Sequence, residues 1–267
     1  MRATRTPAGP ATIEIAVDDA AGSIALSAWG DGAEWAIEHA EDLVGAATPR
    51  YQPPPGAAHE RIAALAREAA GLRLVRTRAV FESLVKVVLA QLVSGAEAKR
   101  TYRALVSAFG EPAPGPHELV LPPSPRAYAA LDGPRATQLG LLGRKLRTLK
   151  EIAWYASRLE PLADAAPDDA ERRLTAIRGI GPWSAQSLLL RTMGSADTVI
   201  TGDYNLPNHV SFALTGEREG DDARMLELLE PYRPCRGLVA LWIEAHADGP
   251  PRRGPRQPLR PLPRKLR

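Results

Sequence analysis

Between residues 11 and 29, apolar and polar side chains alternate with the period of a β-strand. Ile13, Ile15 and Val17 occupy every second position, and residues 23–29 repeat this character after the turn-like segment 18–22. We therefore predict two strands joined by a short loop, followed by a helix over 33–44. A lone hairpin is marginally stable in water, so this small α/β element must pack against the rest of the chain.

From residue 57 to about residue 247, apolar residues recur every three to four positions, which is the pattern of helices packed on a core. The predicted helices are 59–70, 78–93, 95–109, 144–159, 170–177, 182–193, 204–214, 222–229 and 236–247. Between residues 109 and 144 the Pro- and Gly-rich sequence permits short helical turns at most.

The predicted fold class is mainly α, with a small N-terminal α/β element of antiparallel strands. Four prolines within 49–56 mark the boundary between the two parts. We expect the N-terminal element at 1–48, a helical domain at 57–248 and a separate tail at 249–267.

The composition excludes several classes of protein. Of the 267 residues, 45% are hydrophobic and 24% are charged, a balance that can bury a core and excludes disorder throughout. No apolar run approaches the ~18 residues of a membrane-spanning helix, and no apolar segment follows the N-terminal arginines as in a secretory signal. A single cysteine, Cys235, excludes a disulfide framework and cysteine-rich metal sites. We expect a soluble, cytoplasmic protein without a transition metal.

The positive charge is concentrated in the tail. Residues 252–267 hold seven basic residues and no acidic one, which leaves 27 basic against 31 acidic residues elsewhere, a net charge of −4. This Pro/Arg-rich segment lacks periodicity, so we expect it to be disordered. It favours a polyanionic partner or serves only as a solubilising end.

The most informative stretch is the turn Gly179-Ile180-Gly181, which separates two helical patterns. Pro182 follows at the first position of the next helix, where its missing N–H costs nothing. The glycines permit a tight turn and leave backbone N–H groups pointing outward at a helix N-terminus, which suits a phosphate oxygen. This pattern favours a helix-hairpin-helix clamp on the DNA backbone, formed by Gly179, Ile180, Gly181 and Ser184. The alternative is an ordinary joint between helices.

At this point the sequence resembles the helix-hairpin-helix (HhH-GPD) DNA glycosylases, and within them the AlkA-type 3-methyladenine branch. The family carries one catalytic aspartate at the start of the helix after the hairpin, and Asp203 in Val199-Ile-Thr-Gly-Asp203 is the matching residue. The segments Gln91-Leu92-Val93-Ser94 and 230–236 are similar to segments of the same branch. The resemblance covers about residues 57–247, and residues 11–29 look like a reduced form of that branch's N-terminal sheet.

An aspartate before a helix is commonly just a cap, a role that contributes about 1 kcal/mol. The resemblance implies a catalytic role instead, because cleavage of an N-glycosidic bond develops positive charge on the sugar. A carboxylate about 4 Å from that charge contributes roughly 4 kcal/mol at an effective dielectric constant near 20. It can also orient or deprotonate the attacking water.

Two further residues take roles from the resemblance. Trp183 stands where strand-cutting members carry a nucleophilic lysine, and tryptophan cannot form a Schiff base, so a monofunctional glycosylase is implied. In the AlkA-type branch this tryptophan lines the base pocket, where it attracts a cationic base by ~0.5–2 kcal/mol; otherwise it is a core residue supporting the hairpin. Leu92 matches the wedge that fills the space of the flipped base, although from sequence alone it cannot be distinguished from a core leucine.

The base pocket departs from the family pattern. The predicted pocket residues are Trp183, Ser187, Trp242 and Glu244, because Ser187 and Glu244 stand where the branch has aromatic residues and Trp242 is close by. A glutamate there accepts a hydrogen bond from an exocyclic amine, or else it faces solvent.

The resemblance predicts a monofunctional DNA glycosylase that excises damaged, alkylated (3-methyladenine-like) purines from double-stranded DNA by hydrolysis, in base excision repair. We expect a monomer with no cofactor and no membrane contact; the family allows a monovalent cation at the hairpin backbone. The rival hypotheses are a non-catalytic helix-hairpin-helix protein that recognises DNA structure or lesions, and an oxidised-base glycosylase that also cuts the strand.

Overall fold

The computed structural model describes residues 1–46, 48, 51–56, 60–141 and 143–251. Most of the predicted basic tail, residues 252–267, lies outside the described residues. The N-terminal element is an antiparallel sheet of β1 (Arg2–Thr6), β2 (Gly9–Asp18) and β3 (Ser23–Trp29), in that order. The predicted strands β2 and β3 are confirmed, with Ile13 opposite Ala28. Strand β1 was not predicted, because its residues lack an apolar alternation.

The single helix predicted over 33–44 is two short helices, α1 (Ala33–Glu38) and α2 (Ala40–Val44). The break falls at His39, whose backbone leaves the helical region and whose ring Nδ1 lies 2.8 Å from the carbonyl oxygen of Trp35. Ala36 of α1 packs on the sheet with Ala11 and Ile13, and these three buried residues form a small core of their own.

All nine predicted helices of the larger domain are present, with bounds shifted by a few residues and with 144–159 divided at Tyr155. They are α3 (Glu60–Glu68), α4 (Val80–Ala90), α5 (Gly95–Phe109), α8 (Gly143–Trp154) with α9 (Ala156–Leu159), α10 (Pro167–Thr175), α11 (Pro182–Thr192), α12 (Leu206–Thr215), α13 (Asp222–Leu229) and α14 (Arg236–His246).

The segment between α5 and α8 has more structure than the sequence suggested. It holds a small sheet of β4 (Glu111–Pro112) and β5 (Val120–Leu121), then α6 (Pro125–Ala130) and α7 (Gly133–Gln138). Each of these helices begins with a side-chain cap, from Ser124 or Asp132, followed by a proline in its first turn. Pro125 and Pro134 of this Pro-rich stretch therefore stand in the first turns of helices instead of breaking them.

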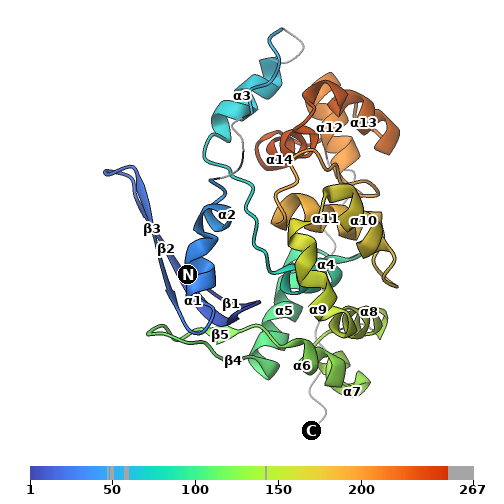
Figure 1. Ribbon diagram of the computed structural model, residues 1–267. Helices are drawn as coiled ribbons and strands as arrows, with labels where there is room; N and C mark the ends of the chain where they lie inside the picture. Colours follow the sequence, from blue (N-terminus) through green and yellow to red (C-terminus); the bar gives the residue numbers. More distant parts are fainter. Residues whose placement is uncertain (47, 49–50, 57–59, 142, 252–267) are drawn as a thin grey trace.

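Helix α11 joins two hydrophobic cores. Leu188 packs in the core built around α4 and α8, whereas Leu190 packs in the core built around α3, α12 and α14. Figure 1 shows α12, α13 and α14 on one side of α11, and α4, α5 and α8 on its other side. Residues at the two ends of α11 therefore lie at the junction of the two halves of the helical domain.

The N-terminal sheet is attached to the helical domain through a buried carboxylate, that of Glu82 in α4. Thr4 donates a hydrogen bond of 2.6 Å to its Oε2, while Arg2 and Lys86 contact Oε1 at 3.2 Å and 2.6 Å. This cluster explains why β1 forms without an apolar pattern, since its polar side chains have a buried partner. Among the described residues, no helix has the length and apolar character to cross a bilayer.

Candidate functional site

The turn between α10 and α11 has the geometry of a helix-hairpin-helix. Gly179 has a φ of +94°, and a Cβ atom there would overlap the side chain of Thr148 in α8, so only glycine fits. Ile180 is buried and anchors the turn in the core. Gly181 caps α11 with an extended backbone and has no atom near the place of a Cβ, so this corner of the hairpin faces open space.

The N-terminus of α11 presents free backbone donors. Pro182 has no N–H, and in the described part of the chain the N–H groups of Gly181 and Trp183 donate to no protein acceptor. Donors of this kind, at the positive end of a helix of 11 residues, favour an anion such as a phosphate oxygen.

Asp203 lies just before α12 and is held by three hydrogen bonds. Its Oδ1 accepts from the backbone N–H groups of Asn205 and Leu206, each at 2.9 Å. Its Oδ2 accepts from Nε1 of Trp183, also at 2.9 Å. One oxygen thus caps α12 while the other reaches the first turn of α11, so the capping role and a role at the hairpin are compatible.

This environment keeps Asp203 ionised. Partial burial by itself raises the pKa of Asp203, but the hydrogen bonds from Trp183, Leu206 and Asn205, together with the positive charge of Arg191, hold its pKa below the ordinary value. A carboxylate has about four acceptor sites and three of them are used here. One acceptor site on a charged, half-buried group remains for a water molecule or for a developing cation.

Leu92 is an exposed apolar side chain next to the hairpin. It is 85% exposed and has a φ of +56°, a conformation that a leucine rarely adopts. The neighbouring Gln91 donates hydrogen bonds to the carbonyl oxygen of Gly179 at 3.0 Å and to Oγ of Ser184 at 2.9 Å. Leu92 is therefore not a core leucine. Backbone strain of this kind is often found at functional sites.

The same hydrogen bond involves Ser184, which we predicted to be part of the DNA clamp. Its residue is buried, its hydroxyl accepts from Gln91, and its backbone N–H donates to the carbonyl oxygen of Gly181. Its hydroxyl keeps one O–H donor, but the residue is only 3% exposed. The hydrogen bond that Ser184 accepts from Gln91 connects the segment that carries Leu92 to the hairpin.

Trp183, Ser187 and Arg191 follow one another at intervals of four residues and lie along one stripe of α11. Trp183 is half-buried and Ser187 is buried. At the far end of the stripe, Nη2 of Arg191 pairs with Oε2 of Glu244 in α14. These two residues line a cavity of about 460 Å³ together with Leu72 and Leu241.

Trp242 is placed differently from our prediction. It is buried, its ring centroid lies 6.1 Å from that of Tyr51, and it lines a separate cavity of about 510 Å³ against α3. Two positions along a helix correspond to a rotation of about 200°, so Trp242 and Glu244 point to opposite sides of α14. Trp242 and Glu244 thus line two different cavities of the described part of the chain.

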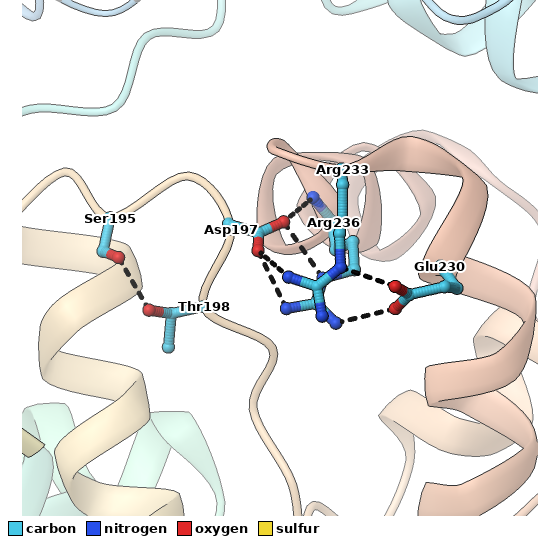
Figure 2. Close-up of polar contacts among 6 residues, drawn as sticks. All are labelled: Ser195, Asp197, Thr198, Glu230, Arg233 and Arg236. Carbon is cyan, nitrogen blue, oxygen red and sulfur yellow. Dashed lines mark hydrogen bonds and ion pairs between the residues drawn. The ribbon is translucent and has the colours of Figure 1, made fainter. Parts of the chain in front are cut away.

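Sequence reasoning missed a charged network that anchors the loop leading to Asp203 (Figure 2). Asp197 of this loop accepts from Arg236 at 2.8 Å and from Arg233 at 3.1 Å. Glu230 binds the other side of Arg236 at 3.0 Å. Hydrogen bonds from Arg236, with its positive charge, hold the pKa of Asp197 below its usual range although burial opposes this. The loop is thus fixed to the start of α14.

A hairpin whose second helix begins beside an ionised aspartate, with an exposed leucine braced against it, defines a helix-hairpin-helix DNA glycosylase fold. The solved 3-methyladenine DNA glycosylase of Archaeoglobus fulgidus shares it, with a TM-score of 0.71, 20% identity, and coverage of 91% of this chain and 84% of that one. So does the 8-oxoguanine glycosylase/lyase of Clostridium acetobutylicum solved with double-stranded DNA, with a TM-score of 0.67, 11% identity, and coverage of 91% and 86%.

In sequence, the chain is 28% identical over 175 residues to DNA-3-methyladenine glycosylase 2 of Escherichia coli. This alignment covers 64% of this chain and 60% of that protein. The chain therefore spans less than two thirds of the length of this relative. No protein-family model matches the sequence. The fold is thus that of the helix-hairpin-helix DNA glycosylases, and the sequence is similar to proteins named DNA-3-methyladenine glycosylase.

Proposed function

We propose that the protein is a monofunctional DNA glycosylase that excises damaged, alkylated purines from double-stranded DNA in base excision repair. The observation that carries this proposal is the bridge from Asp203 to Trp183, which places an ionised carboxylate at the hairpin. Its relatives in sequence are named for 3-methyladenine, whereas the fold is shared with an enzyme named for 8-oxoguanine, so the sequence relatives favour alkylated bases.

The reaction is a hydrolysis at the sugar C1′. As the C1′–N bond breaks, its electron pair leaves with the base, and an alkylated cationic base departs neutral. The carboxylate of Asp203 stabilises the positive charge that develops on the sugar. The remaining acceptor site of Asp203 orients the water that attacks C1′, and the carboxylate then accepts the proton that this water loses. The products are a free base and an abasic site.

The hairpin and Leu92 position the duplex for this step. The free N–H groups at Gly181 and Trp183 bind a backbone phosphate, which fixes position without reading sequence. Leu92, braced through Gln91, enters the space that the flipped nucleotide leaves. Trp183 stands at the position where a lyase requires lysine, so no strand cleavage is expected.

Base release from methylated duplex DNA tests the proposal. Wild type releases modified purines and leaves abasic sites, whereas Asp203→Asn reduces the single-turnover rate by about three orders of magnitude, as expected for a loss of roughly 4 kcal/mol. Asp132→Asn is the matched control, because Asp132 also caps a helix, at 2.7 Å from the N–H of Arg135, but lies outside the site.

Each rival predicts a different outcome. A non-catalytic lesion-binding protein would bind the duplex and release no base, and this result would refute the proposal. A bifunctional enzyme would give a covalent adduct with DNA on borohydride reduction, which would refute the assignment as monofunctional.

A further inference from the structure

Residues 91–94 form the turn between α4 and α5, which we call the wedge loop because it carries Leu92. Leu92 is 85% exposed, so its own side chain makes little contact with the protein, yet its backbone has a φ of +56°. A residue other than glycine keeps such a backbone only where surrounding contacts impose it. Contacts made by other residues must therefore hold the wedge loop in place.

The first of these contacts comes from a buried ammonium group, that of Lys145 in α8. Its Nζ donates a hydrogen bond of 2.6 Å to the carbonyl oxygen of Leu89, in the last turn of α4. Carbonyl groups in a last turn have no partner within their helix, and a positive charge is favourable there. Lys145 also lines a small crevice with Val93 and Glu97. It therefore lies against the chain on both sides of Leu92.

The second contact is the amide group of Gln91, which joins the wedge loop to the hairpin. An amide nitrogen has two N–H donors, and Gln91 uses its nitrogen for both the carbonyl oxygen of Gly179 and Oγ of Ser184. Helix α8 also packs against the hairpin, because the side chain of Thr148 leaves no room for a Cβ atom at Gly179. The wedge loop, α8 and the hairpin thus form one packed unit.

We propose that Gln91 and Lys145 are positioning residues that hold Leu92 in the conformation in which it enters the duplex when the hairpin binds a phosphate. This inference rests on the proposed glycosylase function. The hairpin fixes the phosphate, and the hydrogen bonds of Gln91 fix the wedge loop relative to the hairpin. A group that is already held in its bound conformation loses less freedom on binding. Insertion of Leu92, and with it the flipping of the damaged nucleotide, is therefore more favourable than it would be from a loose loop.

Insertion is measured with a duplex that carries a tetrahydrofuran abasic-site analogue and 2-aminopurine as its neighbour, because 2-aminopurine becomes more fluorescent when it loses its stacking. Gln91→Met keeps the length of the side chain but has no N–H donor. At saturating protein we expect it to lower the insertion equilibrium about threefold to tenfold, the factor that a neutral hydrogen bond supplies. Lys145→Met should act in the same direction, whereas Lys145→Arg keeps a charged donor and should restore part of the signal. Affinity for undamaged duplex should stay unchanged, because the free N–H groups of the hairpin remain.

A double-mutant cycle with Leu92→Ala separates positioning from a general effect on structure. In the Leu92→Ala background, Gln91→Met should reduce the single-turnover rate of base release little further, because its effect passes through Leu92. A residue that only stabilises the fold would cause the same loss with and without Leu92. Gln138→Met is the matched control, because Gln138 pairs with Arg135 on α7 at 3.2 Å and lies outside the site; it should change neither signal nor rate.

Two results would overturn the inference: a 2-aminopurine signal in Gln91→Met equal to that of wild type, or equal losses of rate in the presence and absence of Leu92. Thermal melting verifies that each variant is folded, and Lys145→Gln, with a smaller loss expected, replaces Lys145→Met if that variant is unfolded. The failure of the proposed function has a separate signature, which is that wild type releases no base from methylated DNA. The fluorescence assay requires no base release, so the comparison of wild type with Gln91→Met then still decides the inference.

Discussion

Trp183→Phe separates the hydrogen bond that Trp183 donates to Asp203 from the contact with the damaged base that we propose for it. Phenylalanine keeps an aromatic ring in the first turn of α11 but cannot donate the 2.9 Å hydrogen bond to Asp203 Oδ2. A hydrogen bond to a charged group contributes about 1.5–3 kcal/mol, and water at the half-buried carboxylate recovers part of it. We expect a net loss near 1.4 kcal/mol in transition-state stabilisation, which is about tenfold in the single-turnover rate near neutral pH.

The pH dependence of the rate gives the sharper measurement. Although burial opposes it, the Trp183 bond is among the interactions that hold the pKa of Asp203 below its ordinary value, so its removal raises this pKa. In the mechanism that we propose, base excision requires the ionised carboxylate, so activity is present above the pKa and lost as the pH falls through it. The acid limb of the single-turnover profile should therefore lie at higher pH in Trp183→Phe than in wild type.

Two controls make this prediction refutable. Trp154→Phe alters a tryptophan at the end of α8 that is 79% exposed, and it should leave rate and profile unchanged. In an Asp203→Asn background, Trp183→Phe should cause little further loss, because the two residues act through one hydrogen bond. An acid limb at the same pH in both proteins, or a full tenfold loss in the Asp203→Asn background, would show that Trp183 acts on the base alone.

Three other predictions follow from the fold. In a binding titration, Gly181→Val should weaken affinity for damaged and undamaged duplexes alike. The valine side chain enters open space, so stability should stay unchanged. Gly179→Ala should instead lower the free energy of unfolding, because its Cβ atom would overlap Thr148. Glu82→Gln should cost about 2 kcal/mol in urea unfolding at neutral pH. Burial raises the pKa of Glu82, but Arg2 and Lys86 outweigh this effect and hold the pKa in the folded protein below that in the unfolded chain. The difference in stability between wild type and Glu82→Gln should therefore vanish as the pH falls through the pKa of folded Glu82. Removal of residues 252–267, with seven positive charges, should flatten the salt dependence of duplex affinity, and an unchanged slope would contradict an interaction with DNA.

The helices could be predicted because their apolar periodicity is a local property of the sequence. Strand β1 could not, since it is stabilised by pairing with β2 and by the bond from Thr4 to Glu82, residues 78 positions apart. The helices α6 and α7 were missed for a local reason. We interpreted the whole Pro- and Gly-rich stretch as permitting short turns at most, although a capping residue with a proline one or two positions later starts a helix, as at Ser124 and Asp132.

The candidate site divides in the same way. The hairpin was predicted from its glycines and proline, and Asp203 from the family resemblance; the structure brings them together through Trp183. For the last helix, a choice between Trp242 and Glu244 needed the rotation of α14, which a resemblance between sequences does not fix to within two residues. The structure assigns Glu244 to the cavity with Arg191 and Trp242 to the one with Tyr51.

The network around Asp197 shows why the rest of the site needed three-dimensional information. Asp197 and Arg236 are 39 residues apart, and although Arg236 lies in the family-like segment 230–236, no sequence pattern pairs it with Asp197. Yet their contact (Figure 2) fixes the loop from α11 to α12 at one end. The capping bonds of Asp203 fix this loop at its other end. Because α11 is packed into both hydrophobic cores, the hairpin at its start and this loop after its end cannot shift independently. The position of Asp203 is therefore set by the packing of the whole helical domain.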